Sequence, residues 1–216
     1  MDRLLYLTNC FTKYIIIVAE TDRSSYIRGG IDMLIKDNKK RYSSDEFLAM
    51  TDLEGRYELV SGEIYAMSPA PNIRHQILSG NLFLRIGNYI KDHKGKCHVL
   101  SAPTDVKLND EDTVQPDIFV VCDPDKLDEQ KCNGAPDWII EILSPGNSEH
   151  DTVEKLSIYL KAGVREYWIV DPMSEKVLVY PFEATKAVGV FTFNDKITAG
   201  IYKEESEPLT ICINEL

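Results

Sequence analysis

Two stretches of this sequence set its architecture: VQPDIFVV at residues 114–121 and PDWIIEILSPGNSEHDTVEKL at residues 136–156. Each contains an apolar run typical of a buried strand, and each run carries one acid, Asp117 or Glu141. An ionised side chain in such a run costs several kcal/mol of folding free energy unless it is paired or binds a cation. The two acids therefore indicate a charged site built on two strands.

If the two strands are neighbours in a sheet, both carboxylates can lie on one face of it. A set of oxygen ligands suits a hard cation such as Mg2+ or Mn2+. Such a cation can activate water and offset charge on a phosphate. The alternative is that each acid sits at a strand end, where it is solvated or pairs with Arg or Lys. Taken together, the two acids favour a metal site.

A helix is expected after the second strand, with Ser148 as its N-cap residue and Asp151 three residues later. Lys155 and Tyr159 follow Asp151 at intervals of four residues, so the three share one helix face. Lys155 is therefore a candidate catalytic residue and Asp151 a candidate accessory residue. The alternative is an ordinary surface ion pair between Lys155 and Asp151, with Asp151 also serving as part of the cap.

The segment YELVSGEI at residues 57–64 predicts a β-hairpin around its central Ser-Gly pair. Glu58 and Glu63 lie on opposite sides of that turn, and His75 falls in the first turn of a helix predicted over residues 73–91. Each of the three could complete a metal-binding or water-activating cluster. A single histidine near a helix start is, however, more often a surface or capping residue.

The helix predicted over residues 73–91 has apolar or small residues at intervals of three and four, which indicates a face for close packing. That face comprises Ile73, Ile77, Gly80, Leu84 and Gly87.

Strands are predicted over residues 97–108, 114–121 and 137–143, and a turn at residues 109–112 joins the first two as a hairpin. A second hairpin is predicted over residues 166–180 around an Asp-Pro pair, and the tail has further short strands. The order of hairpin, helix, three strands, helix, hairpin and strands predicts an α/β or mixed α+β fold with one central mixed sheet.

The composition fits one domain with a sizeable core, since the chain has 216 residues, of which 44% are hydrophobic and 27% charged. Residues 1–39 differ in pattern and are expected to be an extension, ordered only in part, before a domain at residues 40–216. The alternative is an extra strand and turn packed on that domain. The five cysteines are odd in number and include no Cys-x-x-Cys pair. This favours a reducing cytoplasm and argues against a disulfide framework or a structural zinc site.

The formal net charge of −11 counts against broad, nonspecific binding of nucleic acid, because neutralising phosphates needs clustered Lys and Arg. It does not exclude a nuclease, since a metal site gathers acids and a local basic rim can coexist with an acidic whole. The sequence has no P-loop, dinucleotide-binding glycine motif, GxSxG or HExxH. It also has no apolar run long enough to span a bilayer.

The chain resembles the Uma-two family of restriction-endonuclease-like proteins, a branch of the PD-(D/E)XK nuclease superfamily. The resemblance covers roughly residues 40–216, includes the helix that begins near His75, and rests on four stretches: YELVSGEI (57–64), VQPDI (114–118), WIIEILSPGNS (138–148) and DTVEKLSIYLKAGVREYWIVDP (151–172). It implies a restriction-endonuclease-like fold, in which helices flank a central mixed β-sheet, with an N-terminal β-hairpin and a C-terminal β extension.

The resemblance also implies metal-assisted hydrolysis of phosphodiester bonds, with Mg2+ or Mn2+ as cofactor. Asp117 and Glu141 would be metal ligands, with the backbone carbonyl of Ile142 nearby. The superfamily places a lysine two residues after the glutamate, where this chain has Leu143. Lys155, on the following helix, is the candidate for that role.

By the same resemblance, Glu58 corresponds to the acid of the first motif, while His75, Glu63 and Asp151 are candidate accessory residues. The resemblance implies a homodimer that acts on DNA. Two alternatives stay open. An RNA-directed enzyme would use the same residues, and a catalytically inactive nuclease-like scaffold for dimerisation or binding would fit the net charge and the missing lysine.

Overall fold

The computed structural model describes four ranges of the chain: 40–67, 71–144, 149–182 and 187–216. Of residues 149–152 it describes the backbone alone. All the described residues belong to one compact unit, Lys39–Leu216. The extension expected at residues 1–39 and the N-cap expected at Ser148 lie outside the described residues.

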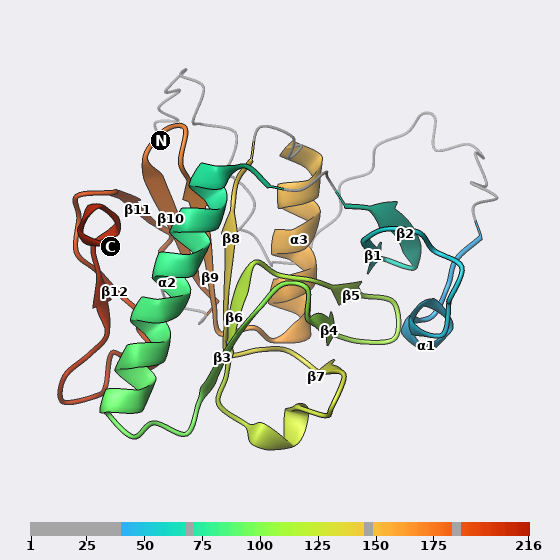
Figure 1. Cartoon of the computed structure of the whole chain (residues 1–216), viewed down its shortest axis with the longest axis horizontal. Helices are drawn as coiled ribbons and strands as arrows, with labels where there is room; N and C mark the ends of the chain where they lie inside the picture. The colour runs from blue at the N-terminus through green and yellow to red at the C-terminus, as the bar shows by residue number, and fades with distance from the viewer. Residues whose placement is uncertain (1–39, 68–70, 145–148, 183–186) are drawn as a thin grey trace, which may run out of the picture. The chain divides into compact units, whose positions relative to one another are not determined.

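Among the described residues, a six-stranded mixed sheet forms the centre of this unit (Figure 1), in the order β11-β10-β9-β8-β6-β3. The strands are β3 (His98–Ser101), β6 (Ile118–Val121), β8 (Trp138–Ile142), β9 (Glu166–Asp171), β10 (Lys176–Pro181) and β11 (Gly189–Thr192). β8 and β9 pair in parallel, and the other neighbours pair antiparallel. Both faces of β6 and β8 are covered, which explains their nearly continuous apolar runs. The predicted mixed central sheet is confirmed.

Two helices, α2 (Ile73–Asp92) and α3 (Glu149–Ala162), pack on opposite faces of this sheet (Figure 1). Successive residues of a strand point to opposite faces. Along β8, Ile140 and Ile142 belong to the core cluster that contains α2, whereas Ile139 belongs to the cluster that contains α3. Glu141 has the same parity as Ile139 and therefore points toward α3.

The packing face expected on α2 is wrong. Ile73, Ile77 and Leu84 are 78%, 59% and 59% exposed, whereas Leu82 and Ile86 are fully buried against the sheet. Residues recur at intervals of three and four on both faces of the helix. The buried face has a continuous series of large side chains, whereas the exposed face is interrupted by glycine. Within the described ranges, no helix, α2 included, is long and apolar enough to cross a lipid bilayer.

A smaller five-stranded sheet shares its core cluster with α3 and has the order β2-β1-β5-β4-β7. Its strands are β1 (Tyr57–Val60), β2 (Glu63–Ala66), β4 (Asp105–Lys107), β5 (Thr113–Val114) and β7 (Lys131–Asn133). The predicted hairpin β1–β2 is confirmed. At its turn Ser61 and Gly62 have φ values of 51° and 77°, the two positive values that a type I′ turn requires.

Two of the predicted strands are wrong in length. Residues 97–108 are divided between β3 and β4, and residues 114–121 between β5 and β6, with the members of each pair in different sheets. Pro103 and Pro116 stand at the two breaks, where a residue without an N–H cannot continue the ladder of hydrogen bonds. The hairpin expected across residues 109–112 is present and joins β4 to β5.

Short elements complete the fold at both ends. The helix α1 (Ser44–Leu48) is capped at its start by Ser43, which exchanges hydrogen bonds with Glu46 in a capping box. β9 and β10 form the second predicted hairpin, and the C-terminal β extension is present as well. The remaining elements are β12 (Ile197–Thr198), β13 (Thr210–Ile211) and the 3-10 turns η2 (Pro124–Lys126), η3 (Gly200–Tyr202) and η4 (Ile213–Glu215).

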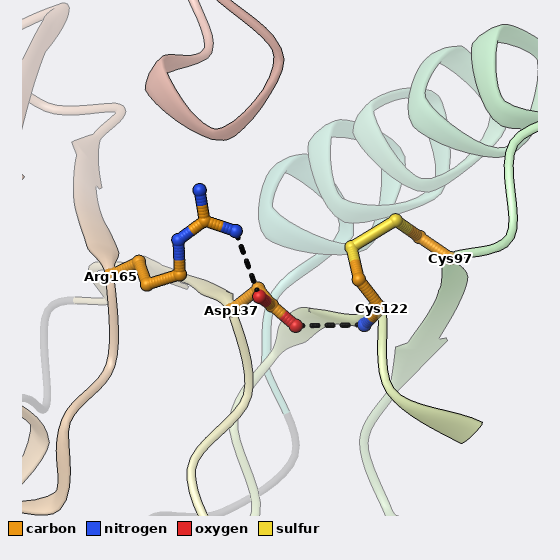
Figure 2. Close-up of a disulfide and its surroundings, with 4 residues drawn as sticks. All are labelled: Cys97, Cys122, Asp137 and Arg165. Carbon is orange, nitrogen blue, oxygen red and sulfur yellow. Dashed lines mark hydrogen bonds and ion pairs between the residues drawn. A yellow bond between two sulfur atoms is a disulfide. The ribbon is translucent and has the colours of Figure 1, made fainter.

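Cys97 and Cys122 form a disulfide between the residue before β3 and the residue after β6 (Figure 2). The expectation that the cysteines form no disulfide is wrong for this pair. In the antiparallel register His98 lies opposite Val121, so the two cysteines are the next opposed pair. Because they are 25 residues apart in the chain, their spacing alone does not reveal this contact.

Asp137, just before β8, links the end of β6 to the start of β9 (Figure 2). Its Oδ2 accepts a hydrogen bond from the backbone N–H of Cys122 at 2.8 Å, and its Oδ1 lies 3.0 Å from the guanidinium of Arg165. These contacts hold the start of β8 in register with both of its neighbours.

Candidate active site

Asp117 and Glu141 meet at one end of the strand pair β6–β8. The register sets Ile118 opposite Ile140, so Asp117, directly before β6, comes next to Glu141. The backbone N–H of Asp117 donates a hydrogen bond to Glu141 Oε2 at 3.3 Å. The two acids therefore lie side by side where neighbouring strands end, and their role as metal ligands stays a prediction.

Lys155 reaches the same end of the sheet from α3. Its ammonium nitrogen lies 3.1 Å from Glu141 Oε1 and 3.0 Å from Glu58 Oε2. Lys155 is only 8% exposed, so its ion pairs with Glu58 and Glu141 are buried. The side chain of Asp151 lies outside the described residues. Since removing one partner from a buried ion pair leaves an uncompensated charge, these contacts hold the three side chains together.

Glu58 and Tyr159 are both buried beside Lys155. Glu58 lies on β1, where its Oε1 accepts a hydrogen bond from the backbone N–H of Gln115 at 2.9 Å. The hydroxyl of Tyr159, one helical turn after Lys155, donates to Glu141 Oε1 at 2.8 Å. The sequence places Tyr159 on the face of Lys155 but gives no sign of this hydrogen bond, because Glu141 lies on a different element.

His75 approaches Asp117 from the first turn of α2. Its Nε2 lies 3.1 Å from Asp117 Oδ2, which also accepts a hydrogen bond from the backbone N–H of Ile142 at 2.8 Å. His75 is buried, contrary to the surface position that is usual near a helix start. Within the described part of the chain its Nδ1 has no hydrogen-bond partner. Burial would lower the pKa of His75. The hydrogen bond and charge of Asp117, together with the backbone of Ile142 and the charge of Glu141, outweigh burial and raise the pKa above its ordinary value.

Burial in this cluster raises the pKa of Glu141. The charge of Lys155 opposes the effect of burial, the charges of Asp117 and Glu58 add to it, and the net result is a pKa of about 7. Burial, followed by the charge of Glu141, likewise raises the pKa of Tyr159 well above its ordinary value. The cluster therefore has more negative than positive charge when its acids are ionised, which a bound cation would offset.

Glu63 lies on the second strand of the β1–β2 hairpin, across the turn from Glu58. It lies at the start of β2 opposite Val60 and accepts a hydrogen bond from Tyr65 at 3.2 Å. Asp151 lies in the first turn of α3, and only its backbone is described. Of the candidate residues, the structure brings together Glu58, His75, Asp117, Glu141 and Lys155.

Oxygen donors for a hard cation are present at this end of the sheet. Asp117 and Glu141 supply carboxylates, and the carbonyl of Ile142 follows Glu141 in the chain. This donor chemistry fits Mg2+ or Mn2+. In the described ranges no group of three or more His, Cys, Asp or Glu side chains could hold a metal ion. The proposed ligand set does not need three such side chains, because it consists of two carboxylates and one backbone carbonyl.

A mixed sheet with a helix on each face and acids at the adjoining ends of two neighbouring strands defines a restriction-endonuclease-like fold. The model of the Uma2 family, described as "Putative restriction endonuclease", matches residues 44–200. This chain belongs to the Uma2 family. The family and the fold class predicted from the sequence are thereby confirmed.

Two similar proteins extend the comparison. "Uncharacterized protein slr1290" of Synechocystis sp. (strain ATCC 27184 / PCC 6803 / Kazusa) is 24% identical over 143 residues, which are 65% of this chain and 74% of that protein. The crystal structure of "a putative nuclease belonging to DUF820" from Anabaena variabilis ATCC 29413 is 23% identical with a TM-score of 0.66, and the match covers 80% of this chain and 96% of that one. The structural match shows a shared fold.

Proposed function

We propose that this protein is a Mg2+-dependent endonuclease that hydrolyses phosphodiester bonds of DNA. The observation that carries the proposal is the convergence of Asp117, Glu141 and Lys155, since Glu141 accepts hydrogen bonds from the Asp117 N–H at 3.3 Å and from the Lys155 ammonium at 3.1 Å. Catalysis of phosphodiester hydrolysis depends mainly on positioning and on compensating charge, and two acids beside a lysine supply both. Mn2+ would serve in place of Mg2+.

Asp117, Glu141 and the carbonyl of Ile142 would hold the cation. When bound, Mg2+ would offset charge on the scissile phosphate and make an attacking water easier to deprotonate. The N–H of Ile142 and the ring of His75 both contact Oδ2 of Asp117. These two contacts would fix the orientation of the carboxylate that binds the metal.

Lys155 would act on the reacting groups. Its ammonium would orient the attacking water or stabilise the charge that develops on the phosphoryl group. Glu58 is a positioning residue, because its carboxylate lies 3.0 Å from that ammonium and holds it beside Glu141. Leu143 occupies the usual position of the lysine, and the buried ammonium of Lys155 would supply the missing charge from α3.

We also propose a homodimer, a cytoplasmic location, and an extension at residues 1–39 ahead of a nuclease domain at residues 40–216. The homodimer rests on the resemblance alone, and light scattering on the purified protein measures it. The cytoplasmic location rests on the odd and scattered cysteines, and the disulfide between Cys97 and Cys122 counts against it.

Cleavage assays with single substitutions test the proposed endonuclease. The wild-type protein should cut DNA in Mg2+ or Mn2+ and not in EDTA. Asp117→Ala and Glu141→Ala should each lower the rate by roughly two orders of magnitude or more, because each removes a charge needed in the transition state. Glu129→Ala, which removes an exposed acid from a loop, is the matched control and should cut like the wild type.

Two other results would change this conclusion. Cleavage that persists in both Asp117→Ala and Glu141→Ala would rule out the proposed centre. Calorimetry that detects no Mg2+ or Mn2+ binding at millimolar concentration would favour the inactive scaffold. The same assay with RNA decides between the two nucleic acids, since the proposed ligands serve either substrate.

A further inference from the structure

A cavity of about 420 Å3 opens next to the candidate active site. Asp117 and His75 form part of its wall, so it adjoins the carboxylate cluster directly. The rest of the wall comes from α2, from the residue before β1 and from the segment after β3. It includes Arg56, Gln76, Ser79, Gly80, Phe83 and Pro103. A cavity of this size falls in the range that holds a small organic group.

Gly80 is an exposed glycine of α2 that lies in the wall of this cavity. It stands in the middle of a 20-residue helix, where glycine is about 1 kcal/mol less favourable than alanine. A Cβ added at Gly80 would meet no other atom within 4 Å, so packing does not require glycine there. Gly87 differs, because its Cβ would lie 3.4 Å from Val99 on β3. The space beside Gly80 is therefore open to a larger side chain, and a bulky substitution at this position would project into the cavity.

The side chains around the cavity suit a nucleobase joined to a phosphate. Phe83 is partly buried against the core and offers an aromatic surface on which a base can stack. Gln76 and Ser79 can form hydrogen bonds with the edge of a base. Arg56 donates through Nε to Gln115 at 2.9 Å, which anchors a guanidinium at the cavity, where it can meet a phosphate.

We propose that this cavity receives the base of a nucleotide next to the scissile phosphodiester, unstacked from its neighbours. The inference rests on the proposed function, because Asp117 belongs both to the cavity wall and to the carboxylate cluster. A base that is stacked and paired in a duplex cannot enter such a cavity without leaving the helix. The substrate is therefore single-stranded or locally unpaired nucleic acid.

The net charge of −11 agrees with this substrate. An extended duplex contact depends on many phosphate contacts from Lys and Arg, whereas a stacked base contributes about 1–3 kcal/mol without any charge. A single base in an aromatic-walled cavity thus provides affinity that an acidic protein does not obtain from the phosphate backbone.

Binding of short fluorescent oligodeoxynucleotides of mixed sequence tests the inference, with Ca2+ in place of Mg2+ to avoid turnover. Fluorescence anisotropy compares the single strand with the same sequence as a blunt duplex. The wild-type protein should bind the single strand roughly tenfold or more tightly, as expected from one stacked base. Gly80→Trp should lose that preference because it fills the cavity, while Asn88→Trp, at an exposed position on the same helix, should keep it.

A wild-type protein that binds the duplex as tightly as the single strand, or that binds neither, would overturn the inference. So would a Gly80→Trp variant that keeps the preference while remaining folded by circular dichroism. Phe83→Ala supplies a second variant and should lose the same roughly tenfold preference. If Gly80→Trp fails to alter binding while Glu141→Ala abolishes cleavage, the cavity is not a base site and the endonuclease stands. If the binding results hold but the wild type cuts nothing in any metal, the proposed function fails and the base site stands.

Discussion

Glu141 is the side chain whose protonation state decides the net charge of the centre. It accepts a hydrogen bond from Tyr159 and pairs with Lys155, yet burial still raises its pKa to about 7. A carboxylic acid in this state is partly protonated near neutral pH in the metal-free protein and ionises when a cation binds. In the proposed metal site, a bound cation would relieve the unfavourable burial of charge.

The metal-free protein should lose stability as the pH rises from about 4.5 to about 7. In this window the unfolded chain has released the proton of Glu141 while the folded protein still binds it, so the free energy of unfolding falls with rising pH. Urea unfolding in EDTA at a series of pH values measures this slope. Glu141→Gln should flatten it and leave the smaller decline due to His75, whose pKa is also raised. An equally steep slope in Glu141→Gln would contradict the assignment.

Lys155 should be required for stability as well as for activity. Lys155→Met leaves Glu58 and Glu141 without their shared ammonium and should lower the free energy of unfolding by about 3–5 kcal/mol. Adding Glu58→Gln to this variant should restore part of the loss, because one unpaired charge is then removed. Lys161→Met, at an exposed position on α3, should change stability by less than about 0.5 kcal/mol. Equal unfolding midpoints for the two lysine variants would refute this role.

The helix α2 shows how packing selects one of two similar rows of side chains. Leu82→Ala should lower the free energy of unfolding by about 2–5 kcal/mol, because Leu82 is fully buried against the sheet. Leu84→Ala makes the same chemical change two residues later at a side chain that is 59% exposed, and should cost less than about 0.5 kcal/mol. Thermal or urea unfolding of this pair decides which row packs. A larger loss of stability in Leu84→Ala than in Leu82→Ala would instead support the packing face expected from the sequence.

The disulfide between β3 and β6 should contribute measurably to stability. Closing a loop of this length should add about 3 kcal/mol to the free energy of unfolding, which a reductant should remove. A variant with Cys97→Ser and Cys122→Ser should be insensitive to the reductant. Free thiols at both positions in protein purified without reductant, detected by mass spectrometry, would show that the bond does not form in solution.

The acidic balance of the whole molecule predicts that nucleic-acid binding depends on a cation. A net charge of −11 and three clustered carboxylates repel phosphates, and a bound divalent ion would reverse the local sign. At fixed ionic strength, an oligonucleotide should bind roughly tenfold more tightly in Ca2+ than in EDTA, a gain of about 1.4 kcal/mol. Asp117→Asn should lose most of this gain. Equal affinity with and without the cation would mean that nucleic acid binds elsewhere.

The sequence by itself determined the strand that carries Glu141, the apolar run that follows Asp117, the first hairpin and its turn, and the extent of α2. These features follow from local composition, from turn chemistry and from capping, which depend on residues close together in the chain. The family and the proposed catalytic role of Lys155 were predicted from a resemblance to known proteins.

Only the tertiary structure decided which row of α2 is buried, how the long predicted strands divide between two sheets, and that Cys97 meets Cys122. It also decided that Lys155 contacts Glu58, a residue 97 positions away, and that Gly80 faces an open cavity. Each outcome depends on contacts between elements distant in sequence, whose free energies exceed the small local preferences that a sequence pattern reports. A period of three and four residues shows that a helix can pack, but the shape and charge of the opposing surface determine which side does.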